Sequence, residues 1–422
     1  MPSVLADLSS KRRPGSGRQM ILVLVFLLVL GVAVHWTVQA RVPTPHAGPD
    51  RPVAAASASP AALASLLHAF RAAVVDRDEA AAAGLGADAA ARQLLRRIVR
   101  NARALEITAF EARYLRQDGE AAPGGARTVV AEVRWQLAGY DPAPSVSKVS
   151  VRLVPEGRRI AIAGIDASGG APAPLWLTSR LHVERSARVL VLAQDFPRAA
   201  RRQAVLARHA LAQVEAVLPQ WRGKAVIEVP ATGRGLAAAL GAQHPVPEDT
   251  AGVMAPAGER RGPGTPVHIF INGAAAGGRP HHLPSARLVL THEMVHLATR
   301  AGDEHLPYWL LEGFAEHVAL RGVQPGPGTA GRIAGAVREG GVPADLPDSR
   351  DFAASGPGVQ AAYQGAWLAC RTLERRLGSA GLVSLHRQVR SGRSLDDALR
   401  LAGWSREGLV RAWQAELAVL AG

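Results

Sequence analysis

The pattern His-Glu-X-X-His at residues 292–296 constrains the fold of this chain more than any other feature. Residues four apart on an α-helix share one face, with Cβ atoms about 5–6 Å apart, so in a helix His292 and His296 can reach a single ion. Glu293 is then placed to act on a water at that ion rather than to bind it. About 0.02 such patterns are expected by chance in a chain of this composition, so the flanking residues must decide its meaning.

The flanking residues favour a metal site over a pair of buried structural histidines. Apolar and helix-forming residues lead into the pattern, and Gly302 is a natural helix end. Pro307 suits the entry to a second amphipathic helix at residues 308–320. A hydrolytic zinc centre needs three protein ligands and one open position for water, and a carboxylate on a second helix is a natural third ligand. Glu312 is the candidate. Glu316, one turn later, could compete as a ligand, although a role in supporting a ligand or a solvated position is favoured.

The segment Trp-Leu-Leu-Glu-Gly-Phe-Ala-Glu at residues 309–316 resembles the gluzincin metallopeptidases, specifically the peptidase MA-like group. In that clan the third ligand is the Glu of a W-L-x-E-G-x-A segment that follows the metal-binding helix. The resemblance assigns His292, His296 and Glu312 to one Zn²⁺ per chain and Glu293 to the general base. Fifteen residues separate His296 from Glu312, a few fewer than in the best-known gluzincin aminopeptidases, so we expect a tighter connecting loop.

The same resemblance implies two further parts of a peptidase site. A Tyr or His downstream often stabilises the oxyanion in gluzincins, and Tyr363 lies where peptidase MA-like chains carry a similar Tyr-containing helix. The alternative is a Tyr that only packs within an Ala-rich helix. An edge strand before the metal helix receives the peptide substrate through backbone hydrogen bonds, and residues 267–271 are the candidate, although their alternation suits any half-buried strand.

Other residues near the motif are expected to be structural. His305 and His317 follow on a loop and a helix, and the pair at residues 281–282 lies in a Pro-flanked loop, so we expect all four histidines at the surface. The single cysteine, Cys370, excludes an intrachain disulfide and lies in an apolar stretch, which predicts a buried thiol.

The N-terminus has the pattern of a membrane signal-anchor. A basic tail at residues 1–19 precedes an apolar run within residues 20–40 that is long enough to span a bilayer. The small residues before position 41 also fit a signal-peptidase site. We therefore expect a single-pass cell-membrane protein with an extracytoplasmic catalytic domain, secreted if it is cleaved after Ala40. Residues 41–60 are rich in Pro, Ala and Ser and indicate a linker.

The formal charge of +14 raises the question of a nucleic-acid partner. The basic residues are nearly all Arg, and they are spread among acidic residues instead of forming a tract. We expect no nucleic-acid binding, and at most a weak attraction to anionic lipid or envelope polymers.

Residues 61–170 predict a small separate domain. Helical periodicity at residues 61–75 and 91–104 is followed by four strand-like segments separated by turn residues. Helices followed by an antiparallel meander resemble the nuclear transport factor 2-like cone. Ligand binding, spacing from the membrane and covering the peptidase are all compatible with it. The predicted strands are residues 105–115, 127–137, 145–153 and 159–165.

A Gly- and Pro-rich stretch at residues 169–174 indicates a domain boundary, and residues 181–422 then predict strands followed by helices. The predicted strands are residues 187–192, 225–229, 252–255 and 267–271, and the predicted helices include residues 201–218, 235–241, 363–377, 380–390, 394–402 and 405–420. The predicted fold class is α+β: a gluzincin-type metallopeptidase domain with a mixed sheet and a helical half, preceded by a small α+β cone-like domain and one N-terminal transmembrane helix.

The sequence therefore predicts a membrane-anchored, extracytoplasmic zinc metallopeptidase that acts on peptides or proteins. One alternative is a catalytically silent envelope protein that binds a ligand or partner and has a structural or decayed zinc site. The intact Glu293 argues against it, because a structural site needs no general base. Another is a hydrolase with the same metal chemistry that acts on a non-peptide amide.

Overall fold

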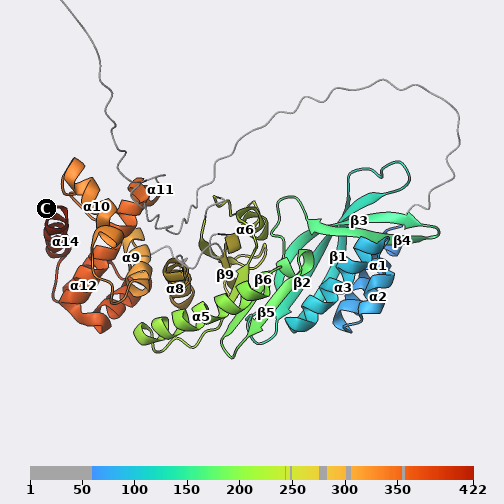
Figure 1. Ribbon diagram of the computed structural model, residues 1–422, viewed down its shortest axis with the longest axis horizontal. Helices are drawn as coiled ribbons and strands as arrows, with labels where there is room; N and C mark the ends of the chain where they lie inside the picture. Colours follow the sequence, from blue (N-terminus) through green and yellow to red (C-terminus); the bar gives the residue numbers. More distant parts are fainter. Residues whose placement is uncertain (1–58, 243, 248–249, 275–282, 301–305, 354–356) are drawn as a thin grey trace, which may run out of the picture.

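The computed structural model describes residues 59–422 except 243, 248–249, 275–282, 301–305 and 354–356. This part of the chain forms an N-terminal domain of helices and one sheet, then a second sheet, then a helical C-terminal half (Figure 1). It is an α+β arrangement.

The N-terminal domain packs three helices on a four-stranded antiparallel sheet of order β1-β2-β3-β4. The predicted helix pair and meander are present, and α2 is an additional short helix. One face of each central strand is apolar, so alternate residues of β2 and β3 are buried. The elements are α1 (Pro60–Val75), α2 (Glu79–Gly84), α3 (Ala89–Ala104), β1 (Ile107–Asp118), β2 (Arg127–Leu137), β3 (Ser145–Glu156) and β4 (Arg159–Ala167).

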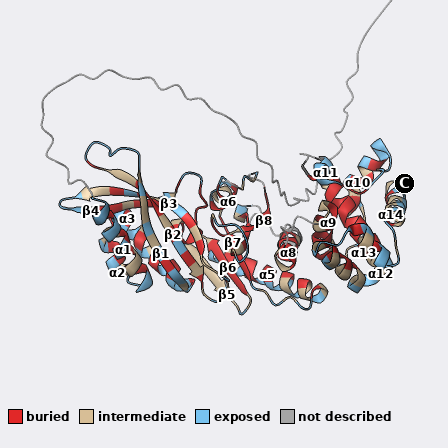
Figure 2. Cartoon of the chain, turned by 180° about the vertical axis from the view of Figure 1, so that it is seen from behind, coloured by how far each residue is buried: buried red, intermediate tan, exposed pale blue. Residues whose placement is uncertain are grey.

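The second sheet has the order β5-β6-β7-β9-β8, with parallel pairs at its centre and antiparallel pairs at both edges. Its central strands are buried on both faces, as expected for strands that lie between two layers (Figure 2). The elements are β5 (Leu181–Arg185), β6 (Val189–Gln194), α5 (Pro197–Val217), β7 (Ala225–Val229), α6 (Gly233–Leu240), β8 (Gly252–Pro256) and β9 (Val267–Ile271).

The prediction that residues 267–271 form an edge strand is wrong. They form β9, which lies between β7 and β8 and pairs with both. Strand β8, which precedes β9 in the sequence, pairs antiparallel with it and forms the edge of the sheet among the described residues. The edge strand beside the following helix, α8 (Leu283–Thr299), is therefore β8.

The helical half contains α8 (Leu283–Thr299), α9 (Tyr308–Ala319), α10 (Pro327–Gly340), α11 (Ser349–Ala353), α12 (Pro357–Arg390), α13 (Leu395–Leu401) and α14 (Arg406–Ala421). The break expected near residue 378 is present, because Gly378 interrupts α12 with φ 71°. Cys370 is buried in α12 as predicted.

The two faces of the second sheet belong to different cores. Side chains such as Val191, Ile227 and Ile269 pack with α5, α8 and the helical half. Leu190, Leu192 and Val226 point the other way, into the core of the N-terminal domain. The boundary at residues 169–174 thus divides the chain, but the apolar core continues across it.

The predicted fold class requires one correction, which concerns the transmembrane helix. Residues 20–40 lie outside the described residues. Within the described part of the chain, no helix is both long enough and apolar enough to cross a membrane. The long helix α5, for example, carries four arginines, and charged side chains are costly in a bilayer. The fold of the described residues is therefore α+β with no membrane-spanning helix.

Candidate metal centre

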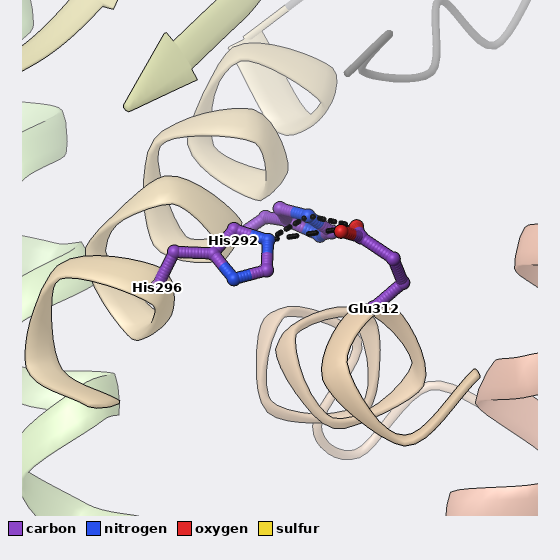
Figure 3. A group of neighbouring side chains, drawn as sticks. All are labelled: His292, His296 and Glu312. Carbon is purple, nitrogen blue, oxygen red and sulfur yellow. Dashed lines mark hydrogen bonds and ion pairs between the residues drawn. The ribbon is translucent and has the colours of Figure 1, made fainter. Parts of the chain in front are cut away.

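Helix α8 presents both motif histidines from one face. It lies against β8, β9 and α5 on one side and α9 on the other, and residues 289–296 are all buried. The side chains of Leu290, Met294 and Val295 fill the surrounding core, while His292 and His296 point toward α9 (Figure 3). The predicted helical spacing thus brings the two imidazoles together inside the protein.

Three ligand atoms meet between α8 and α9. His292 Nε2 lies 2.9 Å from His296 Nε2 and 3.2 Å from Glu312 Oε2, and His296 Nε2 lies 3.5 Å from the same oxygen (Figure 3). Donors about 2.0–2.1 Å from a tetrahedral ion lie about 3.3–3.4 Å from one another. Within the described ranges, these three residues form the group that could hold a metal ion.

Glycine at position 313 permits the close approach of α9 to α12. A Cβ atom on Gly313 would lie 2.4 Å from the carbonyl oxygen of Ala366 on α12, which is too close for any side chain. Helices α9 and α12 therefore pack backbone to backbone, and Glu312 is fully buried at this contact. The Glu-Gly pair thus combines a candidate metal ligand with the close packing that holds its helix in place.

Glu316 lies beside His292 on the side away from the ligand atoms. Its Oε2 atom is 3.1 Å from Nδ1 of His292. A carboxylate only accepts hydrogen bonds, so Nδ1 carries the proton and Nε2 is left to face the ion. Of the roles that the sequence allowed, competing ligand, supporting residue or solvated side chain, this contact matches a residue that orients His292. Glu312 is the carboxylate that meets the ligand atoms.

Several buried polar atoms at this centre have no hydrogen-bond partner in the protein. They are both carboxylate oxygens of Glu293, Oε1 of Glu312 and Nδ1 of His296. Buried polar groups are normally paired, so a cluster of unpaired ones marks a place that binds something else. The backbone of Met254 in β8 is near enough to Glu293 to lower the pKa of its carboxyl group. The donor set and its unpaired atoms fit a bound cation with a water beside Glu293.

The pKa values of the two carboxylates at the centre shift in opposite directions. Burial raises the pKa of Glu293, against the lowering effect of the His292 and His296 charges. Burial would also raise the pKa of Glu312, but the His296 charge and the hydrogen bonds from both histidines outweigh it and lower the pKa to about 2. Glu312 thus stays ionised, as a cation ligand must, whereas Glu293 has a raised proton affinity.

Two tyrosines and a phenylalanine line one side of the centre. Tyr363 on α12 is 2% exposed, and its ring centroid lies 6.4 Å from that of His292. Phe352 contacts both Tyr363 and Tyr308, at 5.1 Å in each case. Burial raises the pKa of both hydroxyls, to about 12 for Tyr308, and the Glu312 charge adds to this. Both therefore remain proton donors at neutral pH. Tyr308 was not predicted, although it lies one helical turn before Glu312.

Two other histidines pack behind the ligands. His317 was expected at the surface, but its side chain is mostly buried and Nε2 lies 2.9 Å from Glu374 on α12. His386 stacks on Phe314 with ring centroids 4.3 Å apart, and burial with nearby positive charge lowers its pKa to about 3. His386 was not predicted, because its ordinary helical context carries no motif. The predicted surface histidines at 281, 282 and 305 lie outside the described residues.

Comparison with known proteins does not assign this chain to a family. No family model matches the chain, and no curated protein matches its sequence.

Proposed function

We propose that this chain is a zinc-dependent metallopeptidase with Glu293 as its general base. The observation that carries the proposal is the convergence of His292, His296 and Glu312 beside the unpaired, buried carboxylate of Glu293. Two imidazole nitrogens and one carboxylate oxygen are a donor set typical of catalytic zinc with an open fourth position. A site that only stabilises the fold has no use for an additional, unpaired carboxylate next to the three ligands.

Each residue has a distinct chemical task in the proposed reaction. Bound zinc would acidify a water and polarise the substrate carbonyl. Glu293 accepts the proton of that water and passes it to the leaving amine, and its raised pKa suits it to hold a proton between the two steps. Glu316 keeps His292 in the tautomer and orientation that a ligand needs. The surrounding apolar core excludes bulk water and strengthens these interactions.

The edge strand β8 is the proposed substrate-binding strand, in place of β9. Beyond β8 the sheet has no further strand among the described residues, so its outer backbone groups can pair with an extended peptide. A Cβ atom on Gly252 would lie 2.8 Å from side-chain atoms of Val289 and Ile271, so β8 lies directly on α8. Because Met254 approaches Glu293, a peptide paired with β8 would cross the metal centre.

Tyr363 remains the proposed donor to the oxyanion, and Tyr308 is a second candidate. Both hydroxyls stay protonated at neutral pH, as a donor must. Separate Tyr363→Phe and Tyr308→Phe variants distinguish them: the donor's removal lowers kcat about 10²–10³-fold with KM little changed.

The test compares Glu293→Gln with Glu339→Gln, which changes an exposed glutamate on α10. We expect the wild-type chain and both variants to bind one zinc and the wild type and Glu339→Gln to cleave a mixed peptide library. Glu293→Gln should lower kcat by about 10²–10⁴-fold, because it removes proton transfer. Unchanged cleavage in Glu293→Gln would contradict the mechanism. Zinc binding with no peptide cleavage by the wild type would favour the silent-protein alternative, or an enzyme for a non-peptide amide.

A further inference from the structure

A second buried histidine joins the two sheets of the molecule. His268 on β9 is 1% exposed, with Nδ1 2.7 Å from Glu228 Oε1 on β7 and Nε2 3.0 Å from Asp141 Oδ1. Asp141 belongs to the connection between β2 and β3 of the N-terminal domain, and its other oxygen accepts a hydrogen bond from the Leu137 amide at 3.0 Å. Both imidazole nitrogens therefore face carboxylates, one from each side of the domain boundary. We name these three residues, His268, Asp141 and Glu228, the interdomain cluster.

The N-terminal domain makes a second polar contact just beyond β8. The amide of Glu259 donates to the carbonyl of Val146 at 2.7 Å, and its carboxylate lies 2.9 Å from Lys148 Nζ. The neighbouring Gly258 is in such close contact that a Cβ atom there would lie 2.3 Å from the Val146 carbonyl oxygen. The backbone after β8 is thus pressed against the start of β3.

Both contacts hold the same end of the β8–β9 pair. His268 pairs in register with Ala255 of β8, next to the end of that strand. At the other end of β8, Gly252 packs against α8. Met254, whose backbone is near Glu293, lies between these two points. The edge strand is therefore held by the metal-binding helix at one end and by the N-terminal domain at the other.

The interdomain cluster can hold the strands in only one position. A buried ion pair is stable only while its partners keep good geometry, because displacement leaves a charge unpaired away from water. A shift of the N-terminal domain would separate Asp141 from His268 and would also open the apolar core around Leu190, Leu192 and Val226. The charges add directional contacts to an interface that the apolar side chains stabilise.

We propose that Asp141 and His268 are positioning residues, through which the N-terminal domain fixes the β8 strand beside Glu293. The N-terminal domain is then a part of the catalytic unit, in contrast to a ligand-binding module or a spacer. The catalytic consequence rests on the proposed function, whereas the fixing of β8 does not. Disturbing the cluster should weaken substrate alignment and leave the metal ligands in place.

The experiment uses the full chain and compares Asp141→Ala with Asp141→Asn. The Asn oxygen can accept from the Leu137 amide, and its NH2 group can donate to Nε2 of a neutral His268 whose Nδ1–H donates to Glu228. Hydrogen exchange is measured over residues 252–271, together with metal content, KM and kcat. In Asp141→Ala we expect at least about tenfold faster exchange there and about tenfold higher KM, with metal content unchanged. Asp141→Asn should show exchange rates and a KM close to those of the wild type. Glu416→Gln is the control, because it weakens the ion pair of the mostly buried Glu416 on α14 with the half-exposed Arg375 on α12 and should leave exchange over 252–271 unchanged.

Glu259→Gln provides an independent variant if Asp141→Ala fails to fold, because its side chain is partly exposed. It should accelerate exchange in β8 more than in β6. Unchanged exchange over residues 252–271 in both the Asp141 and the Glu259 variants would overturn the proposal. Faster exchange with unchanged KM would also overturn the positioning role. If the wild type cleaves no peptide, the proposed function fails, but the exchange result still decides whether the N-terminal domain fixes β8.

Discussion

The metal centre and the interdomain cluster are built from the same residue types but arranged in opposite ways. Each places a fully buried histidine among carboxylates. In both cases burial alone would lower the histidine pKa, and the neighbouring carboxylates instead raise it to about 10. At the metal centre Nε2 atoms from two rings converge on one carboxylate oxygen. In the interdomain cluster one ring has its two nitrogens directed to two separate carboxylates.

The two clusters differ in whether their buried polar atoms all have hydrogen-bond partners, and this difference distinguishes a candidate binding site from a structural contact. Both nitrogens of His268 and both oxygens of Asp141 have partners. At the metal centre, both oxygens of Glu293 and one nitrogen of His296 have none in the protein. His268 and His292 are similarly buried and have similarly raised pKa values, so neither property of the histidine alone distinguishes the two clusters. The unpaired atoms and the direction of the lone pairs do.

The largest expected contrast is between His268→Ala and His296→Ala. His268→Ala leaves two buried carboxylates, Asp141 and Glu228, without the cation between them, which should cost about 3–5 kcal/mol of unfolding free energy while metal binding persists in the folded protein. His296→Ala should abolish metal binding and destabilise the metal-free protein less. Denaturant unfolding and metal analysis of both variants measure this. Loss of metal in His268→Ala, or its retention in His296→Ala, would contradict the assignment of His296, and not His268, as the metal ligand.

A smaller contrast is expected between the two carboxylates that orient a histidine. Glu316→Gln weakens the acceptor for His292 Nδ1, and changes at such positions lower metal affinity by about 10–100-fold. Glu228→Gln makes the matched change beside His268 and should leave metal affinity unaltered. Competition with a chelator gives both affinities. Equal affinities for Glu316→Gln and the wild type would remove Glu316 from the site.

The close contact between α9 and α12 gives the next prediction. Gly313→Ala places a Cβ against the Ala366 carbonyl and should reduce unfolding free energy by about 1–3 kcal/mol through overpacking. It should also shift Glu312 and weaken metal binding. Gly331→Ala is the control, because a Cβ there meets nothing within 4 Å. Thermal unfolding with and without metal tests both, and equal behaviour of the two variants would contradict the packing argument.

The interdomain cluster also predicts how stability depends on pH. The folded pKa of His268 is about 10, and that of an unfolded histidine is about 6.5. A raised folded pKa stabilises fully below pH 6.5 and is lost as the pH rises toward 10, with a slope of about 1.4 kcal/mol per pH unit between these values. Unfolding of the metal-free protein between pH 6.5 and 9 should show this decline. His292 has a similarly raised pKa in the metal-free protein and adds its own slope, so His268→Gln should remove about half of the total decline. An unchanged slope in His268→Gln would contradict the contribution of His268.

Local patterns predicted much of this fold. The His-Glu-X-X-His spacing required a helix, and α8 presents both histidines on one face. The turn residues between strands separated the four strands of the first sheet, and Gly378 marked the break in α12. Each of these features depends on neighbours in sequence, for which periodicity and turn chemistry are sufficient signals.

The features that the sequence did not predict depend on contacts between distant segments. Strand order is one: residues 267–271 have the alternation of a half-buried strand whether β8 covers their edge or not. The interdomain cluster is another, because Asp141, Glu228 and His268 are separated by 40 or more residues and form no motif. Glu312 was predictable only through its family-like context, since no periodic pattern distinguishes it from Glu316.

The most direct test of this account is anomalous X-ray diffraction at the zinc edge from crystals of the zinc-loaded protein. We predict one ion bonded to Nε2 of His292, Nε2 of His296 and an oxygen of Glu312 at about 2.0–2.2 Å, with a fourth position open toward Glu293. No zinc is expected at the interdomain cluster, whose histidine nitrogens are both engaged. An ion absent from the three ligands, or one bound at His268, would contradict the central claim.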